Sequence, residues 1–187
     1  MVTIIGITGN KFNGKSIVAE YLCKNYGFME FSFAHPLKEA CKIIFGFNDQ
    51  QLYGDKKEDI DYRWNIKPRE VLQFVGTELF RNQLGKLLPE IGENIWIASL
   101  IEKIKAMVEE YPLCSIVISD IRFQNEIDAL RDFNGAHIWK IVNDRIIKKD
   151  THSSEDIDKL KNIDSTIVND STLDSLYEKI SFLIKNG

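Results

Sequence analysis

Short apolar runs and longer segments with helical spacing alternate along the chain. The first run, residues 2–7, is rich in β-branched residues and predicts a buried strand. Residues 16–25 follow it, with apolar side chains recurring at the spacing of one helix face. Similar runs predict further strands over residues 28–33, 115–120, 137–142 and 166–168. Strands that alternate with helices predict an α/β fold whose parallel sheet is covered on both faces.

Proline and glycine mark the ends of further predicted helices. Pro36 and Pro68 each occupy the favoured first turn, whereas Gly46 and Pro112 mark where a helix ends. The predicted helices run over residues 37–45, 68–80, 95–111, 124–134 and 173–185. The long third helix has one apolar face, on which two copies of the chain could pair as a homodimer. Residues 48–65 are polar, and we predict that they form a mobile surface insert rather than core.

The composition serves mainly to argue against some classes of protein and of partner. A length of 187 residues suits one domain, and 44% hydrophobic with 28% charged residues is ordinary for a globular protein. The net charge of −4 and the absence of a dense basic run argue against nucleic-acid partners. No stretch approaches the ~20 apolar residues that a membrane span needs. The three cysteines lack metal-ligand spacing, so we expect buried free thiols and a cytoplasmic protein.

A phosphate-binding pattern, G-x-x-x-x-G-K-[ST], lies between the first predicted strand and the first predicted helix. It consists of Gly9, Asn10, Lys11, Phe12, Asn13, Gly14, Lys15 and Ser16. The two glycines allow backbone conformations that turn successive N–H groups toward a polyphosphate. Lys15 would contact the β- and γ-phosphates, and the Ser16 hydroxyl would ligate Mg²⁺. The loop predicts a nucleoside triphosphate site; the alternative is a glycine-rich turn that binds nothing.

A second polar group follows the predicted strand over residues 115–120. Asp120 ends that strand, and ligands bind at the carboxyl ends of parallel strands. We predict that it lies near Ser16 and orders Mg²⁺ or orients a substrate hydroxyl; the alternative is that it caps the next helix. Arg122 and Glu126 begin that helix. We interpret them as ligands of a phosphate and of a base or sugar hydroxyl, rather than as a weak surface salt bridge.

The helix that Pro68 begins carries a polar stripe. Its members recur every four positions and are Arg69, Gln73, Thr77 and Arg81. Arginines that flank an amide and a hydroxyl suit a phosphate and a base edge, although an exposed stripe is the alternative. Gly76 costs ~1 kcal/mol inside a helix, which indicates close approach of a ligand or another helix. Lys38 lies in the first turn of the preceding helix, where the dipole disfavours a cation, and is a further candidate anion ligand.

A basic segment follows the strand predicted over residues 137–142. It contains Arg145, Lys148, Lys149, Asp150, His152 and Glu155. A lid that closes over phosphates would lie at this position, whereas as plain surface the segment would be unremarkable.

These motifs resemble those of the deoxynucleoside monophosphate kinases of large bacteriophages and large DNA viruses, within the P-loop nucleoside monophosphate kinases. Beyond the loop, the similarity lies in blocks at residues 33–38, 68–78, 120–126, 150–155 and 167–170. Many NTPases share the loop, whereas the 68–78 and 150–155 blocks are narrower.

The resemblance implies a three-layer αβα sandwich with a parallel central sheet. It implies one domain over residues 1–187, with a helical acceptor-binding insert at about 33–112 and a short lid at about 143–157. The implied reaction moves the γ-phosphoryl group of ATP, with Mg²⁺, to a deoxynucleoside monophosphate such as dTMP, dGMP or dCMP. The implied compartment is the host cytoplasm if the chain is viral.

The resemblance also implies roles for individual residues. The acceptor phosphate would be held by Lys38, Arg69 and Arg122. The base and sugar pocket would be lined by Gln73, Gly76, Thr77, Trp96, Asn125 and Glu126, with Glu155 from the lid. Catalysis would involve Lys15, Asp120 and Arg122. The family often has an arginine where this chain has Asn143, and Arg145 is the candidate to replace it.

Other function classes compete with this interpretation. Residues 132–135 resemble the D-x-x-G element of GTP-binding switches, but they lie at a predicted helix end and no N-K-x-D motif follows, so we interpret them as a helix stop. Kinases of the same fold act on dephospho-coenzyme A or phosphomevalonate. A P-loop protein can also be a plain NTPase.

Overall fold

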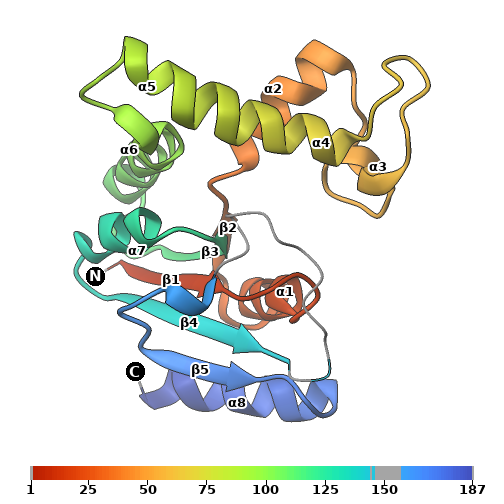
Figure 1. Ribbon diagram of the computed structural model, residues 1–187. Coiled ribbons are helices and arrows are strands. Elements are labelled where there is room, and N and C mark those ends of the chain that lie inside the picture. Colours follow the sequence, from red (N-terminus) through yellow and green to blue (C-terminus); the bar gives the residue numbers. More distant parts are fainter. Residues whose placement is uncertain (1, 144, 146–156, 187) are drawn as a thin grey trace. The chain divides into compact units, whose positions relative to one another are not determined.

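The computed structural model describes residues 2–143, 145 and 157–186, which form two compact units (Figure 1). The first unit contains the chain up to Ser32 and from Ile101 onward. The second unit is Phe33–Leu100.

The first unit is built on a five-stranded parallel sheet with the order β2-β3-β1-β4-β5. The strands are β1 (Thr3–Thr8), β2 (Met29–Phe31), β3 (Ser115–Ile121), β4 (Ala136–Val142) and β5 (Ser165–Val168). All five predicted strands are therefore present, and the prediction of a parallel sheet is confirmed. Because the strands are parallel, the segments that follow them leave the sheet at one edge.

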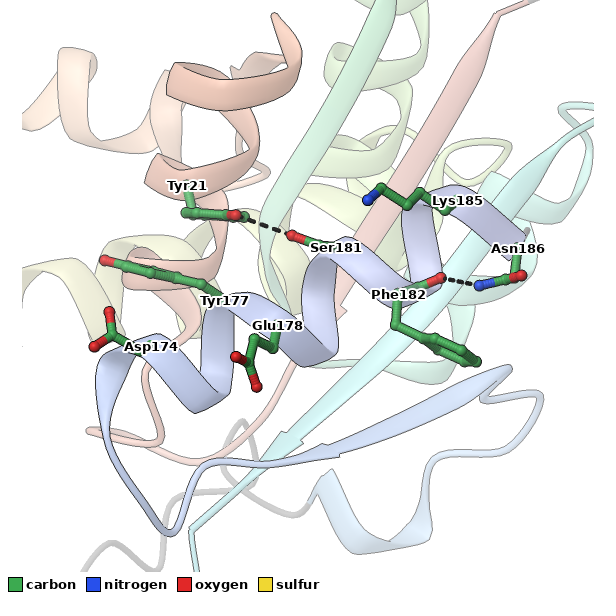
Figure 2. Close-up of a pocket in the computed structure, with 8 residues that line it drawn as sticks. All are labelled: Tyr21, Asp174, Tyr177, Glu178, Ser181, Phe182, Lys185 and Asn186. Carbon is green, nitrogen blue, oxygen red and sulfur yellow. Dashed lines mark hydrogen bonds between the residues drawn. The ribbon is translucent and has the colours of Figure 1, made fainter.

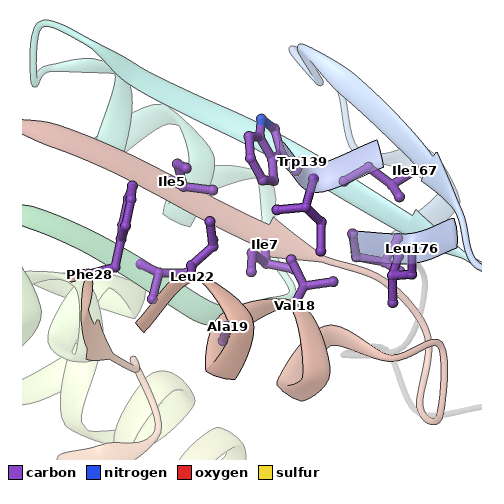
Figure 3. Packing of buried hydrophobic residues seen from close by; sticks show 12 residues of the cluster. Ile5, Ile7, Val18, Ala19, Leu22, Phe28, Trp139, Ile167 and Leu176 are labelled. Atoms are coloured by element: carbon purple, nitrogen blue, oxygen red, sulfur yellow. The ribbon is translucent and has the colours of Figure 1, made fainter. Parts of the chain in front are cut away.

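Helices cover both faces of this sheet, as predicted. One face carries α1 (Lys15–Tyr26) and α8 (Leu173–Asn186), whose apolar residues pack with Ile5 and Ile7 of β1 (Figure 3). The other face carries α7 (Gln124–Arg131). On that side a Cβ added to Gly6 would lie 2.4 Å from Ile121 Cδ1 of β3 and 3.3 Å from Leu130 Cδ1 of α7, so these side chains pack closely on β1. The period-two alternation along β1 thus divides its residues between two cores.

The predicted helix stop at residues 132–135 is also present. Helix α7 ends at Arg131, and Gly135 adopts a φ of +85° before β4 begins. The D-x-x-G similarity therefore belongs to a helix–strand connection and not to a switch that follows a strand.

The second unit is helical. Its elements are α2 (His35–Phe45), α3 (Asp49–Leu52), the 3₁₀ turn η1 (Lys56–Glu58), α4 (Pro68–Gln73), the π-helical segment η2 (Phe74–Gln83), α5 (Leu84–Leu87), the 3₁₀ turn η3 (Gly92–Asn94) and the start of α6 (Ile95–Glu110). The three helices predicted in this region are confirmed. The helix begun by Pro68 differs in one respect, because it changes to π-helical bonding after Gln73. Pairing of two copies through α6 stays a prediction.

Most of residues 48–65 are exposed, as predicted for a surface insert, but two residues of the segment are buried. The mobility of the segment stays a prediction. Leu52 is fully buried, and only 4% of Asp61 is exposed. The Asp61 carboxylate accepts bonds from Arg63 Nε (3.0 Å), Arg63 NH2 (2.7 Å) and Gln51 Nε2 (2.7 Å). Arg63 NH2 also donates to the Gly46 carbonyl at the end of α2 (3.0 Å). Asp61 is thus a buried charge whose partners satisfy it, whereas most other charged residues of the segment face water.

We expect Asp61→Asn to lower the melting temperature by several degrees at pH 7. Hydrogen bonds from Arg63 and then Gln51 hold the pKa of Asp61 well below its usual range, despite burial. The unfolded carboxyl titrates at about 3.9, so the stabilisation is present above that pH and is lost as the pH falls toward the folded pKa.

Thermal unfolding followed at pH 7 and at pH 3.5 tests this expectation. The difference between wild type and Asp61→Asn should be smaller at the lower pH. Asp59→Asn, at an exposed residue of the same segment, is the matched control and should unfold like the wild type. Equal melting temperatures for Asp61→Asn and wild type at pH 7 would contradict the structural role of Asp61.

The cysteines differ from the expectation in their burial. All three are free, but only Cys41 is buried, while Cys23 and Cys114 are half-buried. Burial raises the pKa of the Cys41 thiol to about 11, so that thiol is protonated at neutral pH. Among the described residues, no helix is long and apolar enough to cross a membrane.

Candidate phosphoryl-transfer site

The phosphate-binding loop connects β1 to α1, as predicted. Gly9 has a φ of +153° and Gly14 a φ of +100°, conformations that residues with a side chain rarely adopt. A Cβ added to Gly9 would lie 2.4 Å from the Ile141 carbonyl oxygen of β4. The first glycine is therefore required both by its backbone conformation and by the neighbouring strand.

Lys15 contacts the loop itself. Its Nζ donates to the carbonyl oxygens of Gly9 (2.6 Å) and Asn10 (2.9 Å), which holds the ammonium at the mouth of the loop. Ser16 is exposed in the first turn of α1, and that turn contains no acidic residue. The backbone N–H groups of the first turn and the positive dipole end of α1 favour an anion there. Lys15 and Ser16 thus have the placement that a polyphosphate with Mg²⁺ requires.

Asn13 anchors the loop to β4. It is 3% exposed, and its Nδ2 donates to the Ile141 carbonyl at 2.8 Å. Its backbone N–H donates to the Asn10 carbonyl (3.2 Å). The predicted contact of Asn13 with the nucleotide, like that of the rest of the loop, stays a prediction, because the bonds that the structure shows are structural.

Asn169 contacts the phosphate-binding loop, a role that was not predicted from the sequence. It follows β5, and its Nδ2 donates to the Asn13 carbonyl at 2.9 Å. The same Nδ2 lies 2.5 Å from the place of a Cβ on Gly14. Two side-chain amides therefore hold the loop in position: that of Asn13, which bonds to β4, and that of Asn169, which follows β5. The block at residues 167–170 was visible in the sequence, but nothing local indicated a contact across 156 positions.

Asp120 lies where the sequence predicted, at the carboxyl end of β3. Strand β3 is paired with β1, with Thr8 opposite Ile121, and the Thr8 hydroxyl donates to the Ile121 carbonyl (2.9 Å). Asp120 is half-buried next to this pair and hence close in register to Gly9. The described residues contain no cluster of three or more His, Cys, Asp or Glu that could hold a metal. Ser16 and Asp120 as ligands of Mg²⁺ stay a prediction.

Glu126 caps the start of helix α7. The sequence had left this capping role open for Asp120. Glu126 Oε2 accepts the backbone N–H groups of Arg122 (2.8 Å) and Phe123 (3.1 Å) at the start of α7. Glu126 is 2% exposed, so a surface salt bridge is excluded. Arg122 and Asn125 are half-buried beside it. Contact of Glu126 with a base or sugar stays a prediction, because its demonstrated bonds are structural.

In the second unit, the polar stripe is not an exposed helix face. Arg69, Gln73 and Thr77 are half-buried, and Arg81 is 7% exposed. The last two members of the stripe, Thr77 and Arg81, lie on η2, where π-helical bonds join residues five apart. Arg69, on the preceding α-helical part, forms an ion pair with Glu58 of η1.

The close approach that Gly76 indicated is to another helix. A Cβ there would lie 2.7 Å from a Leu37 methyl carbon of α2. The Gly76 carbonyl accepts a hydrogen bond from the Trp96 indole N–H at 2.9 Å. Trp96 is 8% exposed, and its ring packs against that of Phe80. Gly76 and Trp96 therefore pack the interior of this unit, and their assignment to a base pocket stays a prediction.

Two candidate cations remain. Lys38 lies in the first turn of α2, as predicted, with its Nζ 4.4 Å from the centre of the Tyr53 ring. Arg145 is exposed, and its backbone N–H donates to Asn143 Oδ1 (3.1 Å). The other lid residues named above, including His152 and Glu155, lie outside the described residues.

A surface hollow beside α1 and α8 contains none of the predicted site residues (Figure 2). Tyr21 of α1 stacks on Tyr177 of α8 with ring centres 4.2 Å apart. The Tyr21 hydroxyl is also 3.0 Å from Ser181 Oγ. These contacts join the two helices, and we assign them a packing role.

Comparison with known proteins places these features in a family. A family model described as deoxynucleotide monophosphate kinase matches residues 46–180. A deoxynucleotide monophosphate kinase of Acanthamoeba polyphaga mimivirus is 38% identical over 190 residues, covering 100% of this chain and 98% of that protein. The deoxynucleoside-5'-monophosphate kinase of Escherichia phage T5 is 38% identical over 107 residues, covering 57% of this chain and 37% of the phage protein.

Solved structures agree on the fold. An unliganded sugar kinase from a Janibacter species superposes with a TM-score of 0.52 at 14% identity, covering 99% of this chain and 95% of that one. This likeness supports the α/β fold and nothing finer. The near full-length viral relative and the matching family model identify a phosphotransferase. The chain belongs to the deoxynucleotide monophosphate kinase family, of the type found in viruses and phages.

Proposed function

We propose that this kinase transfers the γ-phosphoryl group of ATP to a deoxynucleoside monophosphate, such as dTMP, dGMP or dCMP. The products are ADP and the deoxynucleoside diphosphate. The observation that carries the proposal is the loop between β1 and α1, where Lys15 and Ser16 stand at the positive end of a helix. Family membership supports a nucleotide as the acceptor.

In the donor half, the loop binds the triphosphate. Backbone N–H groups at the start of α1 and the Lys15 ammonium neutralise the β- and γ-phosphates. Ser16 and Asp120 hold Mg²⁺, which supplies positive charge to the transferring group when it is bound. Asn13 and Asn169 keep the loop in the required conformation through their amide bonds.

In the acceptor half, Lys38, Arg69 and Arg122 bind the monophosphate. Gln73, Thr77 and Asn125 offer amide and hydroxyl groups for the base and sugar. A phosphate oxygen of the acceptor attacks the γ-phosphorus in line while the bond to the leaving ADP oxygen breaks. That oxygen is already anionic, so positioning and charge neutralisation suffice without a strong general base. Arg145 is the lid cation that we assign to the transferring phosphoryl group.

An ADP-release assay tests this proposal. The chain is supplied with ATP and Mg²⁺ and with each deoxynucleoside or ribonucleoside monophosphate, dephospho-coenzyme A or phosphomevalonate in turn. We expect acceptor-dependent ADP release with at least one deoxynucleoside monophosphate. ADP release that is equal with and without every acceptor would identify a plain NTPase, and turnover with only one of the last two compounds would overturn the acceptor class.

A further inference from the structure

Residues 49–58, which form α3 and η1, contact both cations of the second unit that we assign to the acceptor phosphate. The Tyr53 ring centre is 4.4 Å from Lys38 Nζ, a cation–π distance. The Glu58 carboxylate pairs with Arg69 through Nε of the guanidinium. One segment thus supplies a partner for each of two cations that come from different helices.

Tyr53 is held in place by α2. Its hydroxyl donates to Glu39 Oε1 at 2.9 Å and lies 3.1 Å from His35 Nδ1. Because the phenol has one proton, which goes to Glu39, the bond with His35 requires a proton on Nδ1. Two polar contacts therefore fix the ring against the first turn of α2, beside Lys38.

Glu58 belongs to the same anchored segment. Leu52 is fully buried on one side of it, and Asp61 on the other side is bound by Arg63 and Gln51. The carboxylate therefore comes from a part of the chain that is itself attached to the unit. Because Glu58 takes the Nε side of the guanidinium, the two terminal nitrogens form the edge that suits a phosphate.

We infer that Tyr53 and Glu58 are positioning residues that hold Lys38 and Arg69 ready for the phosphate of the acceptor. This inference rests on the proposed function. Long cationic side chains lose rotamer freedom when they bind an anion, and partners that order them beforehand reduce that cost. A Glu58 carboxylate that only competed with phosphate for Arg69 would have the opposite effect, because it would weaken acceptor binding.

Steady-state kinetics distinguish positioning from competition. The acceptor used is whichever of dTMP, dGMP and dCMP gives the highest turnover. Glu58→Ala and Tyr53→Leu should each raise the acceptor KM by about tenfold and leave the KM for ATP unchanged. Glu58→Gln keeps an oxygen that can accept the Nε–H bond, so it should recover most of the acceptor affinity, which a general loss of structure would not allow. Tyr53→Phe keeps the ring but loses the hydroxyl that fixes it, so its acceptor KM should lie between those of Tyr53→Leu and the wild type.

Matched controls come from the residues that follow this segment. Asp59→Ala and Tyr62→Leu alter exposed residues of the same types, Tyr62 being 91% exposed, and should leave both KM values unchanged. The melting temperature of every variant shows that the fold is intact. A lowered acceptor KM in both Glu58→Ala and Glu58→Gln would overturn the inference and identify Glu58 as a competitor.

Arg69→Ala and Lys38→Ala distinguish failure of this inference from failure of the proposed function. Raised acceptor KM in these two variants, with unchanged KM in Glu58→Ala and Tyr53→Leu, would overturn the inference alone. Unchanged acceptor KM in Arg69→Ala and Lys38→Ala would reject their assignment to the acceptor phosphate, and the positioning roles with it.

Discussion

Replacing Lys15 with Met is expected to reduce phosphoryl transfer by about 10³-fold or more, the range found when a cation aimed at transition-state charge is removed. The Lys15 ammonium is held at the loop mouth by the Gly9 and Asn10 carbonyls, where negative charge on the γ-phosphoryl group must be neutralised. Methionine has a similar length but no charge, so the loop keeps its shape and loses the interaction. Single-turnover measurement with saturating ATP and acceptor reports the loss in the chemical step.

Lys11→Met is the matched control for this variant. Lys11 is in the same loop, but its Nζ is 4.9 Å from the centre of the exposed Phe12 ring rather than at the loop mouth. We expect turnover within a few-fold of wild type for Lys11→Met, and unchanged melting temperatures for both variants. Near-normal turnover of Lys15→Met would reject the loop as the donor site.

The second large effect is expected from Gly14→Ala, which should weaken ATP binding by about tenfold or more, equivalent to at least about 1.4 kcal/mol. A Cβ at Gly14 would meet Asn169 Nδ2 at 2.5 Å, while φ there is +100°. The substitution therefore forces Asn169 away from the Asn13 carbonyl, or it moves the loop. Either response displaces the N–H groups that face the phosphates.

Gly27→Ala, at the other end of α1, separates backbone strain from this clash. Gly27 has a φ of +70°, and nothing lies within 4 Å of its added Cβ. It should cost roughly 1 kcal/mol of stability, as expected for a left-handed residue with a side chain, without changing ATP affinity. Calorimetric titration with a non-hydrolysable ATP analogue measures both variants. Equal affinity of Gly14→Ala and Gly27→Ala would show that the contact with Asn169 does not shape the loop.

The strands and most helices could be predicted from the sequence because their signals are local. The β-branched run before the loop, Pro36, Pro68 and the helix stops act on the backbone within a few residues. The position of Asp120 was predictable for a related reason, since parallel strands end at one edge of the sheet. The phosphate-binding loop is likewise contiguous, so its chemistry can be recognised without knowledge of the fold.

Burial of polar residues could not be predicted in the same way. A carboxylate that binds Arg63, as Asp61 does, has the same letter in a sequence as one that faces water. Glu126 was assigned to a ligand or a surface pair, yet it accepts two backbone N–H groups at the start of α7. In both cases the partner decides the role, and a single sequence does not reveal the partner.

The sequence by itself determined the order of strands and helices and the glycine loop with Lys15 and Ser16. It also showed further Lys and Arg side chains that could bind a second phosphate, that of the acceptor. Only the tertiary structure decided that Asn169 holds the loop and that Glu58 pairs with Arg69. Local conformation follows from dihedral preferences and side-chain periodicity within a few residues, which the chain carries everywhere. Contacts between distant segments depend on how the elements pack, and packing is settled by the whole set of buried surfaces at once.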